Sequence, residues 1–498
     1  MTITTIEELT ITQVHDALLA GTYTVRELVE AYLERIRTLD AEGPALNSIV
    51  TVSDTALEEA DAQDAYLAAN RKLSGPLHGV PVVVKDQIET AGIPTSFGSA
   101  ATGAYTAAQD ATAIAQLRAA GAIILAKTTM PDFATSWFST SSRSGITRNP
   151  YDLARDPGGS SSGSAAAVAA NLSLVGIGED TGGSIRLPSS FCNVVGLRVT
   201  PGLISRAGMS SLVVPQDTAG PITRTVTDAA VVLDALVGYD PKDPYTATYA
   251  IARHSGTYAE AVTRDGLAGK RIGVLRQAFG PESDAESAEV NDVIRQALAA
   301  VEAAGAQLVD VEVPNLTGYV ADTSVYFSRS RQDMNAFIAK RPELGIDSIE
   351  QLHAEGKFHE KLDLFVGIAT GPATAKDDPS YPDRVALQGD FQRLVAGIMA
   401  EQKLDAICFP DVKLAAPSHE DIFADRWTCL TYPTNTVIAS QLLFPAITVP
   451  AGFTSGGLPV GLEIMALPYS EPILLGLAHG VEKATAARRA PSLSQVTA

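Results

Sequence analysis

Two glycine–serine turns constrain this chain more than any other stretch. Gly158-Gly159-Ser160 and Gly182-Gly183-Ser184 both lie within residues 156–188. Glycine lacks a Cβ and adopts backbone conformations closed to other residues, so such turns let the main chain approach a ligand closely. The two turns are therefore the first place to look for a site.

The residues between the two turns predict how they are related in space. Alanine is the strongest helix former, so the alanine-rich run 165–170 predicts a closely packed helix. The apolar run 172–177, which ends among glycines, predicts a buried strand. A helix followed by a strand that runs back brings Ser160 and Ser184 together.

Helical and strand-like segments alternate along the rest of the chain. The predicted helices cover residues 6–40, 53–70, 110–120, 226–237 and 290–304, and the predicted strands cover 82–84, 122–126, 271–275, 307–312, 406–409 and 446–450. This alternation predicts an α/β fold, a large mixed β-sheet with helices on both faces. No repeat or linker divides the chain, so residues 1–498 are expected to form one domain. Residues 316–435 are expected to elaborate it on the substrate side.

Composition excludes several classes of partner. The 498 residues carry 37 Lys and Arg against 57 Asp and Glu, a formal charge of −20, which argues against nucleic acid or an anionic membrane as the main partner. The start lacks a signal-peptide pattern, and no run of 18 apolar residues occurs, so we expect a cytoplasmic protein. The three cysteines are too scattered for a disulfide framework or a zinc site.

Common chemistries for glycine-rich turns do not fit this sequence. The string Gly-x-x-x-x-Gly-Lys-Ser/Thr of phosphate-binding loops is absent, and so is Gly-x-Ser-x-Gly around Ser184. None of the seven histidines lies in a distinctive glycine-rich setting. A serine nucleophile in these turns therefore needs a base other than histidine.

Lys85 is the candidate base. It follows the β-branched run 82–84, and burial in apolar surroundings lowers the pKa of a lysine, so that its neutral form can accept a proton. The alternative is an ordinary salt-bridged lysine, paired with Asp86. The turn 182–184 likewise has two interpretations, an oxyanion hole built from backbone N–H groups or a plain tight turn.

Long ordered strings in this chain resemble the amidase signature family over most of its length. They cover residues 75–86, 126–133, 149–152, 158–170, 182–188, 196–198, 217–226 and 444–452. The resemblance implies a hydrolase that cleaves non-peptide C–N amide bonds with no metal or organic cofactor. Many members of the family have glycine where this chain has Ser162, which leaves the detail of that loop open.

The resemblance also implies a role for each site residue. Lys85 would be the general base, Ser160 the bridging serine after a cis Gly159-Ser160 peptide, and Ser184 the nucleophile that forms an acyl-enzyme. The oxyanion hole would be formed by Thr181, Gly182, Gly183 and the amide of Ser184. The supporting positions would be Ser161, Asp180 and Arg186.

The substrate is less determined by the sequence. We expect an apolar pocket for an amide or anilide, lined by the aromatic residues Trp137, Phe138, Phe191, Trp427 and Tyr432. The alternative is that most of these are ordinary core residues. A carbamate substrate is a variant of this expectation. Two alternatives stay open: the glutamine-amidase subunit of a tRNA-dependent amidotransferase, and a catalytically silent binding or scaffold protein. The expected partners are a small amide and water.

Overall fold

The centre of the molecule is one mixed β-sheet. The computed structural model describes the chain except for residues 1–5, 104, 253–254, 265 and 494–498. Within the described residues, eleven strands form the sheet in spatial order β1 (Ile49–Val52), β3 (Ile123–Thr128), β2 (Pro81–Lys85), β4 (Val175–Asp180), β6 (Thr218–Thr223), β5 (Val195–Arg198), β10 (Ala446–Phe453), β11 (Pro459–Met465), β9 (Ala406–Pro410), β7 (Arg271–Leu275) and β8 (Gln307–Val311).

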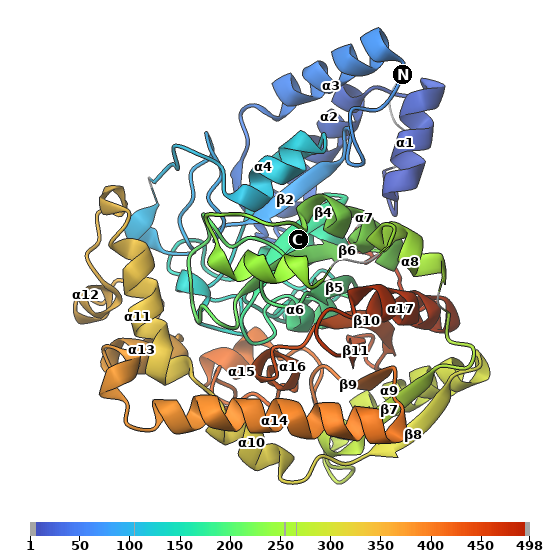
Figure 1. The fold of residues 1–498 in the computed structure, drawn as a ribbon. Helices are drawn as coiled ribbons and strands as arrows, with labels where there is room; N and C mark the ends of the chain where they lie inside the picture. The colour runs from blue at the N-terminus through green and yellow to red at the C-terminus, as the bar shows by residue number, and fades with distance from the viewer. Residues whose placement is uncertain (1–5, 104, 253–254, 265, 494–498) are drawn as a thin grey trace.

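The predicted fold class is confirmed by this sheet. Strands β3, β2 and β4 are parallel to one another, as are β9, β7 and β8, and the other neighbouring pairs are antiparallel. Every residue of β2, β3 and β4 is buried, so both faces of this part of the sheet are covered. Figure 1 shows helices around the whole length of the sheet.

The helices vary widely in length. They are α1 (Ile11–Ala20), α2 (Val25–Arg35), α3 (Ala56–Asn70), α4 (Thr112–Ala119), α5 (Ser162–Ala169), α6 (Arg186–Phe191), α7 (Val226–Leu236), α8 (Tyr258–Arg264), α9 (Ala285–Ala303), α10 (Leu316–Asp322), α11 (Tyr326–Ile338), α12 (Ile349–Ala354), α13 (Asp363–Thr370), α14 (Tyr381–Gln402), α15 (His419–Phe423), α16 (Val437–Gln441) and α17 (Glu471–Thr485).

The helix predicted over residues 6–40 is in fact interrupted. Helix α1 ends at Gly21, whose φ of +67° is a left-handed conformation that glycine adopts without strain. Helix α2 then begins after Thr24, and Thr24 and Glu27 form a reciprocal capping box. The prediction of a single helix over residues 6–40 is therefore wrong at this point, because the capping box marks the start of a second helix.

The stretch between the two glycine turns is shifted from its predicted bounds. Helix α5 begins at Ser162 rather than at residue 165, so part of the first turn is helical. Strand β4 begins at Val175 rather than at residue 172, because the N–H of Leu172 still bonds the carbonyl of Ala167 at the helix end. Strand β4 extends to Asp180, directly before the second turn.

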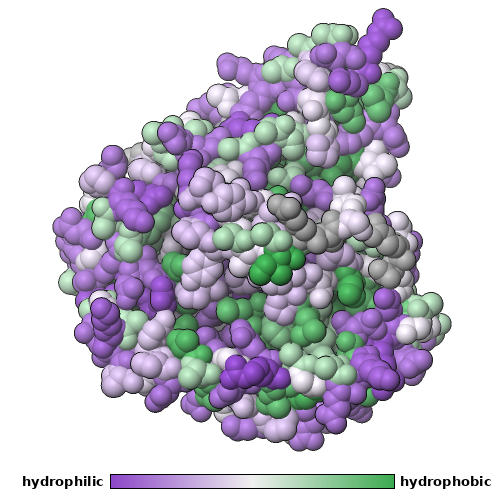
Figure 2. Space-filling model, in the orientation of Figure 1, coloured by the Kyte–Doolittle hydropathy of each residue, from purple (hydrophilic) through white to green (hydrophobic). Residues whose placement is uncertain are grey.

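Residues 316–435 add helices beside the sheet and supply strand β9 to it. Helices α10 and α14 pack through the stacked rings of Tyr319 and Phe391, whose centroids are 4.9 Å apart. Figure 1 shows α14 crossing one end of the molecule, with α11, α12 and α13 gathered at one side. On the face shown in Figure 2, hydrophilic side chains predominate and apolar ones form small separate groups.

Candidate active site

The two glycine turns lie side by side, as the sequence predicts. The N–H of Ser161 donates a hydrogen bond of 3.1 Å to the carbonyl of Ser184. The hydroxyl of Ser161 donates to the carbonyl of Glu179 at 3.3 Å, which joins the start of α5 to the end of β4. The peptide bond between Gly159 and Ser160 is cis.

Lys85 reaches the first of these turns from the end of strand β2. Its Nζ lies 2.8 Å from Ser160 Oγ and donates to the carbonyl of Glu179 at 3.1 Å. Both side chains are completely buried. The alternative of a Lys85–Asp86 salt bridge does not hold, because the Asp86 carboxylate faces Lys127, with 3.8 Å between Nζ and Oδ1.

Burial perturbs the protonation of Lys85. Loss of solvent lowers the pKa of Lys85 to about 8, although the nearby carboxylates of Glu179, Asp180 and Asp217 oppose the shift. A lysine with a pKa near neutrality has a substantial neutral fraction at physiological pH, which an ordinary surface lysine lacks. The amine is therefore able to accept a proton from a neighbouring hydroxyl.

Ser184 lies in the second turn with 3 % of its surface exposed. No hydrogen bond joins Ser184 Oγ to Ser160 Oγ within the described residues. The N–H of Gly183 donates to Asp180 Oδ1 at 2.9 Å, so this amide is engaged. By contrast, the N–H groups of Gly182 and Ser184 donate no hydrogen bond to any described residue, which leaves them available to an anionic oxygen.

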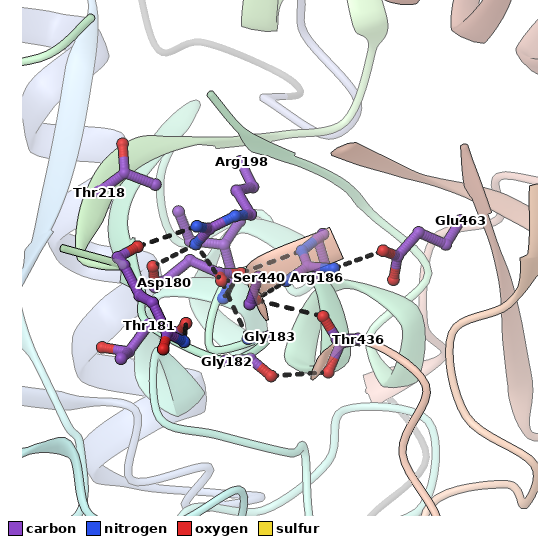
Figure 3. Close-up of polar contacts among 12 residues, drawn as sticks. Asp180, Thr181, Gly182, Gly183, Arg186, Arg198, Thr218, Thr436, Ser440 and Glu463 are labelled. Atoms are coloured by element: carbon purple, nitrogen blue, oxygen red, sulfur yellow. Dashed lines mark hydrogen bonds and ion pairs between the residues drawn. The ribbon is translucent and has the colours of Figure 1, made fainter. Parts of the chain in front are cut away.

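An ion network holds the second turn from beneath. Asp180 accepts hydrogen bonds from Arg186 and Arg198, and Arg186 also pairs with Glu463 of strand β11 (Figure 3). All four side chains are completely buried. Burial alone would raise the pKa of Asp180, but the two guanidinium groups hold it well below its usual range. Asp180 is therefore a permanent anion that anchors the turn.

A distant segment closes the other side of the turn. Thr436 Oγ1 donates to the carbonyl of Gly182 at 2.9 Å, and Ser440 of helix α16 accepts from Arg186 at 2.7 Å (Figure 3). The φ of Gly183 is +123°, and a Cβ at this position would lie 1.9 Å from Thr436 Oγ1. Glycine is required here both by the backbone conformation and by the close approach of Thr436.

The five candidate pocket aromatics separate into three groups. Trp137 and Tyr432 line a cavity of about 240 Å³, which has no charged side chain in its wall. Phe138 and Phe191 are core residues, each 1 % exposed, and Trp427 lines a different, smaller cavity. Phe138 and Phe191 instead pack edge-on against Tyr432, so two of the five predicted residues line this cavity, and its role as the substrate pocket stays a prediction.

The apolar cavity lies beside the candidate oxyanion turn. It is also lined by Tyr326 and Thr434. A Cβ at Gly182 would lie 2.2 Å from the hydroxyl oxygen of Tyr326, and Thr434 Oγ1 is 2.8 Å from Thr436 Oγ1. These contacts put the cavity wall directly against the turn that carries Ser184.

Several residues of the site escaped the sequence-based prediction. Glu179, Arg198, Tyr326, Thr436 and Glu463 were not singled out. Glu179 gave a detectable signal, a second acidic residue next to Asp180 at the end of an apolar strand. The others come from separate segments, and no local pattern marks them.

Metal ligands and membrane-spanning helices are both missing from the described part of the chain. Among those residues, no three His, Cys, Asp or Glu side chains lie close enough together to hold a metal ion. None of their helices is long and apolar enough to cross a bilayer.

Comparisons with known proteins identify the family and the fold. The family model described as Amidase matches residues 27–475. The A subunit of glutamyl-tRNA(Gln) amidotransferase from Oleidesulfovibrio alaskensis is 35 % identical over 497 residues, covering 95 % of this chain and 96 % of that protein. Native peptide amidase from Stenotrophomonas maltophilia matches with a TM-score of 0.85 and 34 % identity, covering 98 % of this chain and 99 % of its own. The A subunit of glutamyl-tRNA(Gln) amidotransferase from Thermotoga maritima matches with a TM-score of 0.77 and 26 % identity over 100 % of both chains.

Proposed function

Since the chain belongs to the amidase family and is an amidohydrolase, we propose that it cleaves a linear C–N amide bond through an acyl-enzyme on Ser184. The single observation that carries this proposal is the buried contact of 2.8 Å between Lys85 Nζ and Ser160 Oγ. A buried neutral amine next to a serine is the arrangement that a base other than histidine requires.

The proposed reaction uses a proton relay. Neutral Lys85 takes the proton of Ser160, and Ser160 takes the proton of Ser184. Ser184 Oγ attacks the amide carbonyl, and the relay returns a proton to the leaving nitrogen. Water then hydrolyses the ester on Ser184. The link from Ser160 to Ser184 closes when substrate binds, as catalytic hydrogen bonds often do.

The second turn is proposed to stabilise the tetrahedral intermediate. The amides of Thr181, Gly182 and Ser184 would bind its oxyanion. Gly183, whose N–H is held by Asp180, supplies the left-handed backbone that aims the neighbouring amides. Ser161 and Arg186 support the two turns through their hydrogen bonds to Glu179 and Asp180.

For the substrate, we propose an amide or anilide with an apolar part. The cavity beside Gly182 carries no charge in its wall, so it would favour an apolar group and disfavour a zwitterion such as free glutamine. Tyr326, Leu364, Cys429 and Leu430 of this wall come from residues 316–435, which supports the proposal that this segment forms the substrate side.

The second candidate function is glutamine hydrolysis within a tRNA-dependent amidotransferase. The sequence relatives favour it, because A subunits of glutamyl-tRNA(Gln) amidotransferases match over nearly the whole chain. In that case ammonia released from glutamine would pass to a partner subunit. The third alternative, a catalytically silent scaffold, has no support, because the family and its named members are enzymes.

A substrate panel tests the proposal. Purified wild-type protein and S184A are assayed in parallel with aliphatic amides, anilides, peptide amides, esters, carbamates and free glutamine. We expect hydrolysis of apolar amides by the wild type without a partner and no hydrolysis by S184A. Hydrolysis of glutamine but of none of the other substrates would favour the second candidate function. Full activity of S184A would refute the mechanism.

A further inference from the structure

Glu179 is a buried carboxyl group that the proposed relay does not use. It is the penultimate residue of β4, and its side chain is 1 % exposed. Its Oε2 lies 3.7 Å from Lys85 Nζ. The other oxygen, Oε1, lies 3.2 Å from Thr181 Oγ1, whose proton is directed to Asp217 over the shorter distance of 2.7 Å. Oε2 accepts no hydrogen bond from the described residues.

The other carboxylates near Lys85 are occupied. Asp180 is held by Arg186 and Arg198. Asp217 accepts hydrogen bonds from the N–H groups of Leu212 and Val213, and from Thr181 Oγ1 at 2.7 Å. Glu179 is therefore the carboxyl group with a free oxygen directed at the amine.

Glu179 also has a path to solvent. It lies in the wall of a cavity of about 350 Å³ that also includes Arg206, Asp217 and Asp333 and reaches the exposed Lys340. This charged cavity is separate from the apolar one, with which it shares no wall residue. A polar cavity of this size has room for water, which would give protons a route between the surface and a buried carboxyl group.

The surroundings shift the pKa values of Glu179 and Lys85 in opposite directions. Burial and the negative charge of Asp217 raise the pKa of Glu179, while burial lowers the pKa of Lys85. The further groups that face the pair are the anion Asp180, the cation Arg198 and the phenol of Tyr326. Two buried groups this close titrate together rather than separately.

We propose that Glu179 is a positioning residue for Lys85, and that the two side chains share one proton. When the proton is on Glu179, Lys85 is a free base that can activate Ser160. When it is on Lys85, the two form an ion pair and the amine is inactive. Glu179 thereby sets the pH range in which the relay works, an inference that rests on the proposed function.

The pH dependence of kcat/KM tests the inference. In the wild type, kcat/KM should rise with pH over two ionisations before it reaches its plateau. The second ionisation is needed because Lys85 is entirely neutral only after the pair has lost its shared proton. In E179Q, a neutral side chain of the same shape, the rise should follow one ionisation. Removal of the carboxylate should lower the pH of half-maximal activity by about one unit. Superimposable wild-type and E179Q profiles would overturn the inference.

Two controls make the result specific. Asp228 is another buried carboxyl group with a raised pKa, and it accepts a hydrogen bond from the N–H of Ile11, so D228N should leave the profile unchanged. E179D keeps a titratable group, so a folded E179D protein should retain the extended rise.

A covalent probe separates this inference from the function on which it rests. The rate at which a fluorophosphonate modifies the wild type and E179Q is measured across the same pH range, with S184A as the blank. Labelling that depends on Ser184 but has the same pH dependence in both proteins would overturn the role of Glu179 alone. Equal labelling of S184A would refute the nucleophile itself.

Discussion

Lys85 Nζ lies 2.8 Å from Ser160 Oγ, and neither side chain has any exposed surface. A charged lysine would donate this hydrogen bond, whereas a neutral one can accept the serine proton. Strand β2 presents the amine, and the turn before α5 presents the hydroxyl. The contact joins the end of a buried strand to a buried turn, and this packing holds the base in place without a histidine.

Removal of the bridging hydroxyl should abolish most of the activity. S160A is expected to lower kcat by about 10²- to 10⁴-fold, because Lys85 then has no partner through which to reach Ser184. Steady-state kinetics on any amide that the wild type hydrolyses will measure the loss. The matched control is S162A: Ser162 Oγ is buried and has no hydrogen-bond partner within the described residues, so its removal should cost little. Equal losses in both variants would argue against a relay.

A methyl group at Gly183 should disrupt the second turn. G183A forces a Cβ to within 1.9 Å of Thr436 Oγ1 and demands a φ of +123°, so both activity and stability should fall. Gly397 lies in the exposed part of α14, where a Cβ would meet no other atom within 4 Å. G397A should therefore stabilise the protein by about 0.5–1 kcal/mol. Urea denaturation of the two variants provides the comparison, and a G183A protein as stable as the wild type would be unexpected.

Loss of the buried guanidinium should destabilise the whole protein. R186M leaves Asp180 with one guanidinium partner and Glu463 with none, at a cost of about 3–5 kcal/mol in the free energy of unfolding. R393M removes a surface pair with Asp390 and should change that free energy by less than about 1 kcal/mol. A small effect for R186M in urea denaturation would mean that the network does not stabilise the fold.

The stability of the protein should depend on Asp132 in slightly acidic solution. Burial raises the pKa of Asp132 to about 6, although its hydrogen bonds with Ser142 oppose the shift. Between about pH 4 and pH 6 the folded state holds a proton that the unfolded state has lost, so this stabilising contribution disappears as the pH rises through that window. D132N cannot ionise. As the pH rises from 4 to 7, the free energy of unfolding of D132N should increase by about 2–3 kcal/mol relative to that of the wild type, as measured from urea midpoints. A constant difference would contradict the assignment.

The strands that the sequence predicted are those marked by runs of mainly apolar residues. Strands β2, β3, β7, β8, β9 and β10 all lie at or near their predicted positions. Strand β6 was missed, because Gly220 and Pro221 interrupt it and both residues weaken a strand pattern. It nevertheless lies between β4 and β5, where tertiary packing overrides local propensity.

The site also combines residues marked by local sequence patterns with residues brought in by tertiary packing. Lys85, Ser160 and Ser184 come from the ends of neighbouring elements, so local patterns and the family resemblance could locate them. Thr436 reaches Gly182 across 254 residues of sequence, and Glu463 reaches Arg186 across 277. Such contacts depend on the packed sheet, and a single sequence does not reveal them.

Mass spectrometry of the covalently labelled protein tests the central claim most directly. The wild type is incubated with a fluorophosphonate and digested, and the modified peptide is sequenced. The account predicts one phosphonylated residue, Ser184, with labelling lost in S184A and slowed in both S160A and K85A. A label on another residue, or an S184A protein that is labelled as fast as the wild type, would contradict it.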